Sequence, residues 1–148
     1  MIRFELVTLS GVKYSQQVYE VQLPTPQGYV GIFPGHAPFV SLATPGVVSI
    51  REQQNQPDDM MDRFAINGGV IEISGSNVRV LVDEADAPEE INEAEIQKAL
   101  EHAKKLRAEA KDQVSLDHAQ QLVDRQAVRL QVAGLKRHRT QRNRKSGQ

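Results

Sequence analysis

The chain has 148 residues and a formal net charge of −1, and it contains no cysteine and no tryptophan. The absence of cysteine excludes a disulfide framework and thiolate chemistry. Because 39% of the residues are hydrophobic but only 5% are aromatic, we expect one domain or two small ones with modest cores. No apolar N-terminal region and no long apolar run occurs, so we expect neither a signal peptide nor a membrane-spanning helix.

Charge is distributed unevenly along the chain. Residues 1–90 hold 5 Lys/Arg and 12 Asp/Glu, a net −7, whereas residues 91–148 hold 13 and 7, a net +6. No acid follows Asp124, but eight bases do. This asymmetry predicts two modules, the second of which meets an acidic partner.

Short apolar or alternating segments, separated by turn residues, fill the first half of the chain. We expect strands within residues 2–9, 18–24, 28–33, 39–42, 47–51, 63–66, 70–73 and 78–82. Clusters of Gly, Pro, Ser and Asn separate them, and a polar loop at 52–59 joins two of them. Strands this short and evenly spaced are typical of an antiparallel sandwich or barrel.

Residues 28–39 specify backbone shape more strongly than any other stretch. Three glycines and two prolines fall within twelve residues, which favours a short strand running into a fixed turn. His36 is the only group here that titrates near neutral pH; it is an acid/base or ligand candidate, or a turn histidine bonded to nearby backbone. Because no Cys, Asp or Glu accompanies it, we interpret it as a turn residue.

Two further segments resemble ligand sites only superficially. Asn67-Gly68-Gly69 leads into a β-patterned segment instead of a helix, so we interpret it as a sharp bend and not as a phosphate loop. Residues 83–90 contain five carboxylates but lack the spacing and glycine of a calcium loop. We expect them to form a linker that places negative charge at the start of a helix.

From Ile91 onward the apolar period changes to steps of three and four, which predicts two amphipathic helices. The interruption at residues 111–115 separates them, and Ser115 is the expected N-cap of the second helix. Each helix of twenty-odd residues would be roughly 30 Å long. Their apolar stripes are rich in alanine and poor in aromatics, so we expect a weakly packed hairpin that can detach and adopt a second conformation.

No catalytic constellation occurs in the sequence. A nucleophile–base motif, a zinc-binding HExxH pair and a Walker-type glycine loop are all missing. His102, His118 and His138 are spaced too widely for a metal pair and are expected on helix surfaces. We therefore predict a binding or regulatory subunit that is not an enzyme and holds no metal.

The segment Gly31-Ile-Phe-Pro-Gly-His-Ala-Pro38 is followed by Leu42 and Pro45-Gly46. Asn67–Glu72 and Val78–Ala85 extend the pattern in the same order. Together these motifs resemble the epsilon subunit of F-type ATP synthases of the bacterial and plastid type. The resemblance implies a β-sandwich of about ten antiparallel strands over residues 1–87 and a regulatory α-helical hairpin over 88–140. Residues 141–148 are basic and are expected to be disordered.

The resemblance also implies partners. In that family the sandwich binds the gamma subunit and the membrane c ring of a proton-translocating synthase, and the helices contact the alpha/beta head and inhibit ATP hydrolysis. Contacts with gamma and the c ring are implied for Gln27, Gly28, Tyr29, Val30, Gly31, Ile32 and His36. Contacts with the beta subunit are implied for Arg125, Arg129, Lys136, Arg137 and Arg139, whose charge suits an acidic partner.

The resemblance places the chain as a peripheral protein on the cytoplasmic face of a bacterial plasma membrane, or on the stromal face of a thylakoid. Some relatives bind ATP through an acid and an arginine at the start of the first helix. Asn92 and Glu95 stand at those positions here, so no nucleotide cofactor is expected. Tyr29 replaces a glutamate found in some relatives.

An alternative reading is a β-sandwich adaptor that binds nucleic acid through the basic C-terminal tail. The acidic first half and the lack of interleaved aromatic residues argue against it. No nucleic-acid partner is therefore expected.

Overall fold

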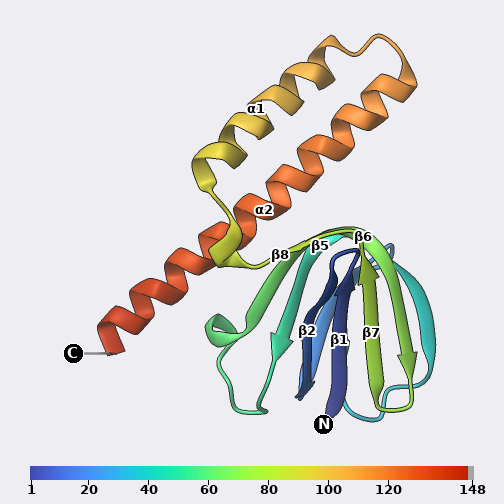
Figure 1. Ribbon diagram of the computed structural model, residues 1–148, viewed down its shortest axis with the longest axis vertical. Helices are drawn as coiled ribbons and strands as arrows, with labels where there is room; N and C mark the ends of the chain where they lie inside the picture. The colour runs from blue at the N-terminus through green and yellow to red at the C-terminus, as the bar shows by residue number, and fades with distance from the viewer. Residues whose placement is uncertain (147–148) are drawn as a thin grey trace. The chain divides into compact units, whose positions relative to one another are not determined.

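The computed structural model describes the backbone of residues 1–146 and the side chains of residues 1–135. The chain divides into two compact units after Asp86 (Figure 1). The first unit is a β-sandwich and the second is a helical hairpin.

Eight strands make up the sandwich. They are β1 (Ile2–Thr8), β2 (Gly11–Val18), β3 (Glu20–Thr25), β4 (Gly28–Ile32), β5 (Phe39–Arg51), β6 (Asp62–Ser74), β7 (Asn77–Val82) and β8 (Ala85–Asp86). The strand order is β2-β1-β7-β6-β5-β3-β4, and β8 pairs with β6. The predicted sandwich is confirmed, but the β1–β7 pair is parallel, so the sheet is mixed instead of purely antiparallel.

The strand count is lower than the ten expected because β5 and β6 are each a continuous strand of 13 residues. The C-terminal half of β6 pairs with β7, whereas its N-terminal half pairs with β8. Likewise, only the C-terminal end of β5 pairs with β3. The two long strands therefore pass from one layer to the other, which closes the sandwich (Figure 1).

Glycines make this passage possible. Gly68 and Gly69 have φ angles of +95° and +156°. A Cβ at Gly69 would lie 2.1 Å from the carbonyl oxygen of Leu81. Only glycine allows the two backbones to approach this closely, which confirms that Asn67–Gly69 is a bend.

The core lies between the inner faces of the two layers. Its fully buried side chains include Ile2, Phe4, Leu6, Val18, Val21, Leu23, Ile32, Val48, Ile50, Ile71, Val78 and Val80. Each such aliphatic or aromatic side chain contributes about 1.5–3 kcal/mol on burial. Strand β2 was not predicted as a strand of its own, because its polar residues 13–17 show little apolar alternation.

The second unit holds a 3-10 turn, η2 (Pro88–Glu90), and the helices α1 (Glu93–Glu109) and α2 (Gln113–Ser146). Asn92 caps α1, since its side chain accepts a hydrogen bond from the Glu95 N–H. Ile96 and Ala103 of α1, and Ala119 and Val123 of α2, are buried apolar residues of the hairpin. The predicted helical hairpin is thereby confirmed.

The start of α2 differs from the prediction. Asp112, not Ser115, is the cap: its Oδ1 accepts from the Ser115 N–H at 2.7 Å, and the Leu116 N–H donates to its carbonyl at 3.0 Å. The hydrogen bonds from Ser115 lower the pKa of the Asp112 carboxyl. With 34 residues α2 is longer than the apolar stripe indicated. The disorder expected for residues 141–148 stays a prediction, because their side chains lie outside the described residues.

Candidate functional site: the β4 edge and the helical hairpin

Strand β4 lies at one end of the sheet and carries most of the sequence-predicted contact residues. A two-residue turn, Pro26-Gln27, joins it to β3. The Thr25 hydroxyl fastens this turn, because it donates to the Gly28 carbonyl at 2.6 Å and accepts from the Gln27 N–H at 3.3 Å. Gly28 has a φ of +109°, which the turn requires.

The exposed fraction of Tyr29 is 59%, but its hydroxyl forms a hydrogen bond within the sandwich. The hydroxyl accepts from the backbone N–H of Val47 at 3.0 Å. A Cβ at Gly46 would lie 2.8 Å from the Tyr29 hydroxyl and 2.7 Å from the Cβ of Pro24. Glycine at position 46 thus makes room for the tyrosine, which ties the edge strand to β5.

Beyond β4 the chain enters the Phe33–Pro38 loop. The rings of Tyr19 and Phe33 pack edge to face with centroids 5.9 Å apart. Gly35 has a φ of +87°, and the exposed His36 donates from Nδ1 to the Ala37 carbonyl at 2.7 Å. This bond confirms that His36 is a turn histidine bonded to nearby backbone.

The predicted contact residues do not form one surface of side chains. Gln27 lies in the turn before β4 and His36 lies in the loop after it. Ile32 is fully buried in the core. Gly28, Tyr29 and Gly31 are exposed and Val30 is half-buried, so what these residues offer a partner is a strand edge.

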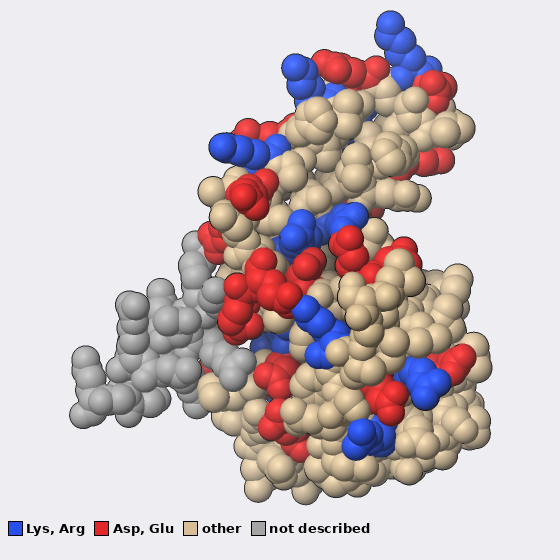
Figure 2. Space-filling model, viewed as in Figure 1, with Lys and Arg blue, Asp and Glu red and all other residues tan. Residues whose placement is uncertain are grey.

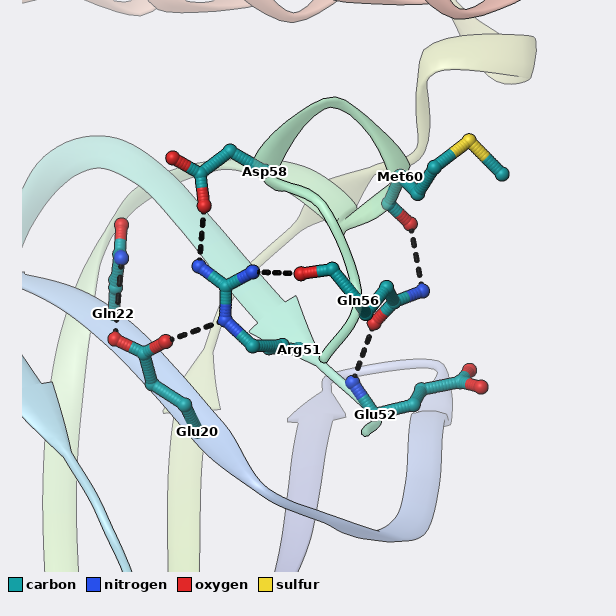
Figure 3. Close-up of polar contacts among 7 residues, drawn as sticks. All are labelled: Glu20, Gln22, Arg51, Glu52, Gln56, Asp58 and Met60. Carbon is teal, nitrogen blue, oxygen red and sulfur yellow. Dashed lines mark hydrogen bonds and ion pairs between the residues drawn. The ribbon is translucent and has the colours of Figure 1, made fainter. Parts of the chain in front are cut away.

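An ion-pair network, which sequence reasoning missed, supports this edge (Figure 3). Arg51 Nε donates to Glu20 Oε1 at 2.8 Å, and Gln22 Nε2 donates to Glu20 Oε2 at 3.2 Å. Arg51 also contacts the Asp58 carboxylate and the Gln56 carbonyl. The hydrogen bonds that the guanidinium donates to Glu20 and then to Asp58 raise the pKa of Arg51. No sequence motif signals this pairing, because the partners lie up to 31 residues apart.

Gln56 completes the network by closing the loop that follows β5. Its side chain accepts from the Glu52 N–H at 2.8 Å and donates to the Met60 carbonyl at 3.0 Å. The short 3-10 turn η1 (Asp58–Met60) ends this loop. Because every group in the network has a structural partner, it holds the loop in place and offers no reactive group.

A row of exposed and half-buried apolar side chains crosses strands β5, β6, β7, β1 and β2. The strand register places Leu42 opposite Val70, Val70 opposite Leu81, Leu81 opposite Val7, and Val7 opposite Val12. Leu42 and Val12 are 64% and 63% exposed. In the view of Figure 2, Lys/Arg and Asp/Glu side chains lie in several separate groups over the sandwich unit, with uncharged residues between them. Contiguous exposed apolar side chains of this kind mark protein contacts.

Of the bases implied to meet a beta subunit, the structure describes two side chains. Arg125 and Arg129 are half-buried on α2, and Arg129 Nη1 donates to Gln126 Oε1 at 3.3 Å. The side chains of Lys136, Arg137 and Arg139 lie outside the described residues. On the hairpin, Lys/Arg and Asp/Glu side chains alternate over the surface seen in Figure 2.

Among the described residues, no group of three His, Cys, Asp or Glu is placed to hold a metal ion. In the same part of the chain, no helix is both long and apolar enough to cross a membrane. Asn92 and Glu95 stand where an acid and an arginine are expected in an ATP-binding motif. In the cap of α1, the Glu95 N–H donates a hydrogen bond to Asn92 Oδ1. This architecture defines a two-unit protein that exposes a strand edge and a row of apolar side chains.

Comparison with known proteins agrees with this class. A family model described as the beta-sandwich domain of the ATP synthase delta/epsilon chain matches residues 1–88. The chain is 32% identical to an ATP synthase epsilon chain of Herpetosiphon aurantiacus over 139 residues, covering 93% of this chain and 98% of that one. It is 35% identical over 103 residues to an epsilon chain of Brucella anthropi, covering 70% and 73%.

Solved structures show the same fold. A chain in the cryo-EM structure of the Euglena gracilis mitochondrial ATP synthase (OSCP/F1/c-ring) superposes with a TM-score of 0.75 at 22% identity, covering 89% of this chain and 80% of that chain. A chain of the Tetrahymena thermophila mitochondrial ATP synthase central stalk and c ring superposes with a TM-score of 0.61 at 14% identity. The protein therefore belongs to the epsilon-chain family of ATP synthases, and it is a non-catalytic subunit of that assembly.

Proposed function

We propose that the chain is a central-stalk subunit of a proton-translocating ATP synthase, in which the sandwich couples gamma to the c ring and the helical hairpin restrains ATP hydrolysis. The observation that carries the proposal is the match of a complete epsilon chain, sandwich and hairpin together, over 93% of this sequence. The assembly would place the subunit on the cytoplasmic face of a bacterial plasma membrane, or on the stromal face of a thylakoid.

Two surfaces support the docking role of the sandwich. The β4 edge, with the Gln27 turn and the His36 loop at its ends, is the proposed contact with gamma and the c ring. The apolar row that includes Leu42 and Leu81 offers additional area that a partner subunit can cover. A subunit that remains inside an assembly tolerates such exposure, because the partner shields it from water.

The charge of α2 supports the regulatory role of the hairpin. No acid follows Asp124, and eight bases do. We propose that Arg125, Arg129, Lys136, Arg137 and Arg139 contact an acidic segment of the beta subunit when the hairpin extends toward the alpha/beta head. Opposite charges steer such a helix to its site and hold it there.

ATP hydrolysis by the assembled complex tests this function. Substituting the five bases with Gln should raise hydrolysis at least about fivefold, in the range of an ordinary allosteric coupling, while the subunit stays assembled. A matched control replaces four exposed lysines of α1 and the following loop (Lys98, Lys104, Lys105 and Lys111) with Gln and should leave hydrolysis unchanged. Equal hydrolysis with the five-base variant and the native chain would contradict the regulatory role.

A further inference from the structure

Asn67-Gly68 is the one place in the sequence where glycine follows asparagine. The amide nitrogen of the next residue can attack an asparagine side chain, and a side chain on that next residue hinders the attack. Glycine has no side chain, so Asn67 is the least shielded asparagine of the chain. The other four precede Gln, Val, Glu and Arg; they are Asn55, Asn77, Asn92 and Asn143.

The hydrogen-bonded ladders on one side of β6 are interrupted at this point. Pairing of β6 with β8 ends at Ile66, and pairing with β7 begins at Gly69. Asn67 and Gly68 therefore lie between the two ladders, where β6 passes from one layer to the other.

The ladder with β5, on the opposite side of β6, is interrupted as well. Asn67 lies opposite Pro45, which has no N–H, and the register passes from there to Ala43–Gly69 without a partner for Gly68. Gly68 is thus the only residue of β6, a strand described in full, that has no register partner on either side. Its backbone is the part of this strand that neighbouring strands restrain least.

The Asn67 side chain is accessible to water. It is exposed, and within residues 1–135 no side-chain hydrogen bond holds its amide. The Asn92 side chain, by contrast, accepts a hydrogen bond from the Glu95 N–H at 3.3 Å. The carbon to be attacked at Asn67 is therefore not fixed by a polar partner, and water can reach the product of the attack.

We propose that Asn67 is a site of spontaneous deamidation, which converts it to aspartate or isoaspartate. The Gly68 nitrogen bonds to Asn67 Cγ, and the side-chain NH2 leaves as ammonia with the proton that water transfers from the Gly68 nitrogen. Water then opens the five-membered imide. Hydrolysis of the bond between the nitrogen and Cγ yields aspartate. Hydrolysis of the bond between the nitrogen and the main-chain carbonyl carbon yields isoaspartate, whose backbone runs through Cγ.

Isoaspartate at position 67 conflicts with the close packing that follows it, because it adds one carbon to the backbone just before Gly68. A Cβ at Gly69 would lie 2.1 Å from the Leu81 carbonyl oxygen, so β6 has no room to move toward β7. Ile66, immediately before the site, is buried in the core. The modification therefore loosens the sandwich at the crossing between its layers, whatever partner the chain binds.

Peptide mapping by mass spectrometry tests the site, after the full chain has been incubated at neutral and at mildly alkaline pH. Asn67 should lose ammonia at least about tenfold faster than any other asparagine of the chain. The rate should rise with pH, because the attacking Gly68 nitrogen must lose its proton. Methylation of the product by a protein isoaspartate methyltransferase distinguishes isoaspartate from aspartate.

Two glutamine variants provide a matched comparison. Asn67→Gln retains the amide but requires a six-membered ring, so ammonia release from the whole chain should fall to about one tenth or less. Asn77→Gln removes an exposed asparagine of β7 that precedes valine, and ammonia release should stay unchanged. Circular dichroism of both variants should match that of the native chain.

Urea denaturation tests the structural consequence. The isoaspartate form, separated from the aged chain, should unfold at a urea concentration lower by at least about 0.5 M. Asn67→Asp introduces the charge without the additional backbone carbon, so its midpoint should change less. An isoaspartate form that unfolds together with the native chain would overturn the loosening of the sandwich.

The site itself is overturned by either of two results. In the first, Asn67 is stable in the folded chain and reacts only in urea, which would show that the strand protects it. In the second, another asparagine reacts faster than Asn67 in the folded chain. If Asn67→Gln misfolds, the relative rates at the five asparagines of the native chain decide alone.

Discussion

At the scale of single residues, Tyr29 combines an exposed ring with a bonded hydroxyl. The hydroxyl satisfies the Val47 N–H, and Gly46 leaves the space that this contact needs. An aromatic residue can therefore serve an interface and the fold together. It also explains how tyrosine is accommodated at a position where some relatives carry a glutamate.

Replacing Tyr29 with Phe should lower the free energy of unfolding by about 1 kcal/mol, because the Val47 N–H loses its acceptor. Urea denaturation followed by circular dichroism measures the change. Tyr19→Phe is the control, since the ring that packs on Phe33 is retained. Equal losses for the two variants would show that the Tyr29 hydroxyl contributes nothing specific.

The raised pKa of the Tyr14 phenol predicts that the free energy of unfolding depends on pH. Burial, then the charges of Asp62 and Glu52, raise the pKa of its phenol above the ordinary value of 10.0. The folded chain thus holds this proton more tightly than the unfolded chain, so the contribution to stability is complete below pH 10 and is lost as the pH rises above it. Tyr14→Phe should make the free energy of unfolding less sensitive to pH between 10 and 11.

That titration is readily measured by urea denaturation at a series of pH values. The Tyr14 ring packs on the rings of Phe4 and Phe64, with its centroid 5.8 Å from each of theirs. A phenylalanine at position 14 retains these ring contacts. A variant whose stability falls as steeply above pH 10 as that of the native chain would contradict the assignment.

At the scale of elements, the sequence predicted most of the strands and both helices, because their apolar periods are regular. It did not reveal that β5 and β6 are continuous. Pro45-Gly46 and Asn67-Gly68-Gly69 look like strand ends, but they are bends within strands that cross between layers. Whether such a segment ends a strand or bends it depends on long-range packing, such as that of Gly69 against the Leu81 backbone. Local β-propensity does not report on this packing.

The contact role of the β4 residues stays a prediction. The residues of the β4 edge were chosen on a resemblance, whereas their register with β3 is known from the structure. The Glu20–Arg51–Asp58 network was missed, because it joins residues distant in sequence. The cap of α2 was placed three residues late, since Asp112 and Ser115 are both good N-cap residues.

Asp112→Ala should destabilise the first turn of α2, because the Ser115 N–H loses its acceptor. Hydrogen exchange should become faster at the amide of Ser115. Asp112→Asn is the matched control, since asparagine caps helices about as well as aspartate. In the native chain the carboxylate's part of this stabilisation should be lost as the pH falls through the lowered pKa of Asp112. Unchanged exchange in Asp112→Ala would contradict the capping role.

At the scale of the whole molecule, the division after Asp86 separates two units that differ in structure and in charge. The sandwich has its own buried core, formed by the residues of β1 to β7. The hairpin depends on small apolar residues such as Ala103 and Ala119. We therefore expect the sandwich to fold without the hairpin, and the hairpin to be the less stable unit.

Deleting residues 88–148 should leave a chain with a cooperative thermal transition and the circular dichroism of a β-protein. The expectation follows because every strand pair of the sheet lies within residues 1–86. An unfolded product would show that the sandwich depends on the hairpin.

Binding of the full chain to a purified gamma subunit, at low and at moderately high salt, tests the proposed rotor role. We expect binding that persists at high salt, because the proposed contact depends on the β4 edge and apolar side chains instead of surface charge. Absence of binding at both salt concentrations would contradict the claim that this chain is a rotor subunit. A nucleic-acid titration of the basic C-terminal segment would then be the next experiment.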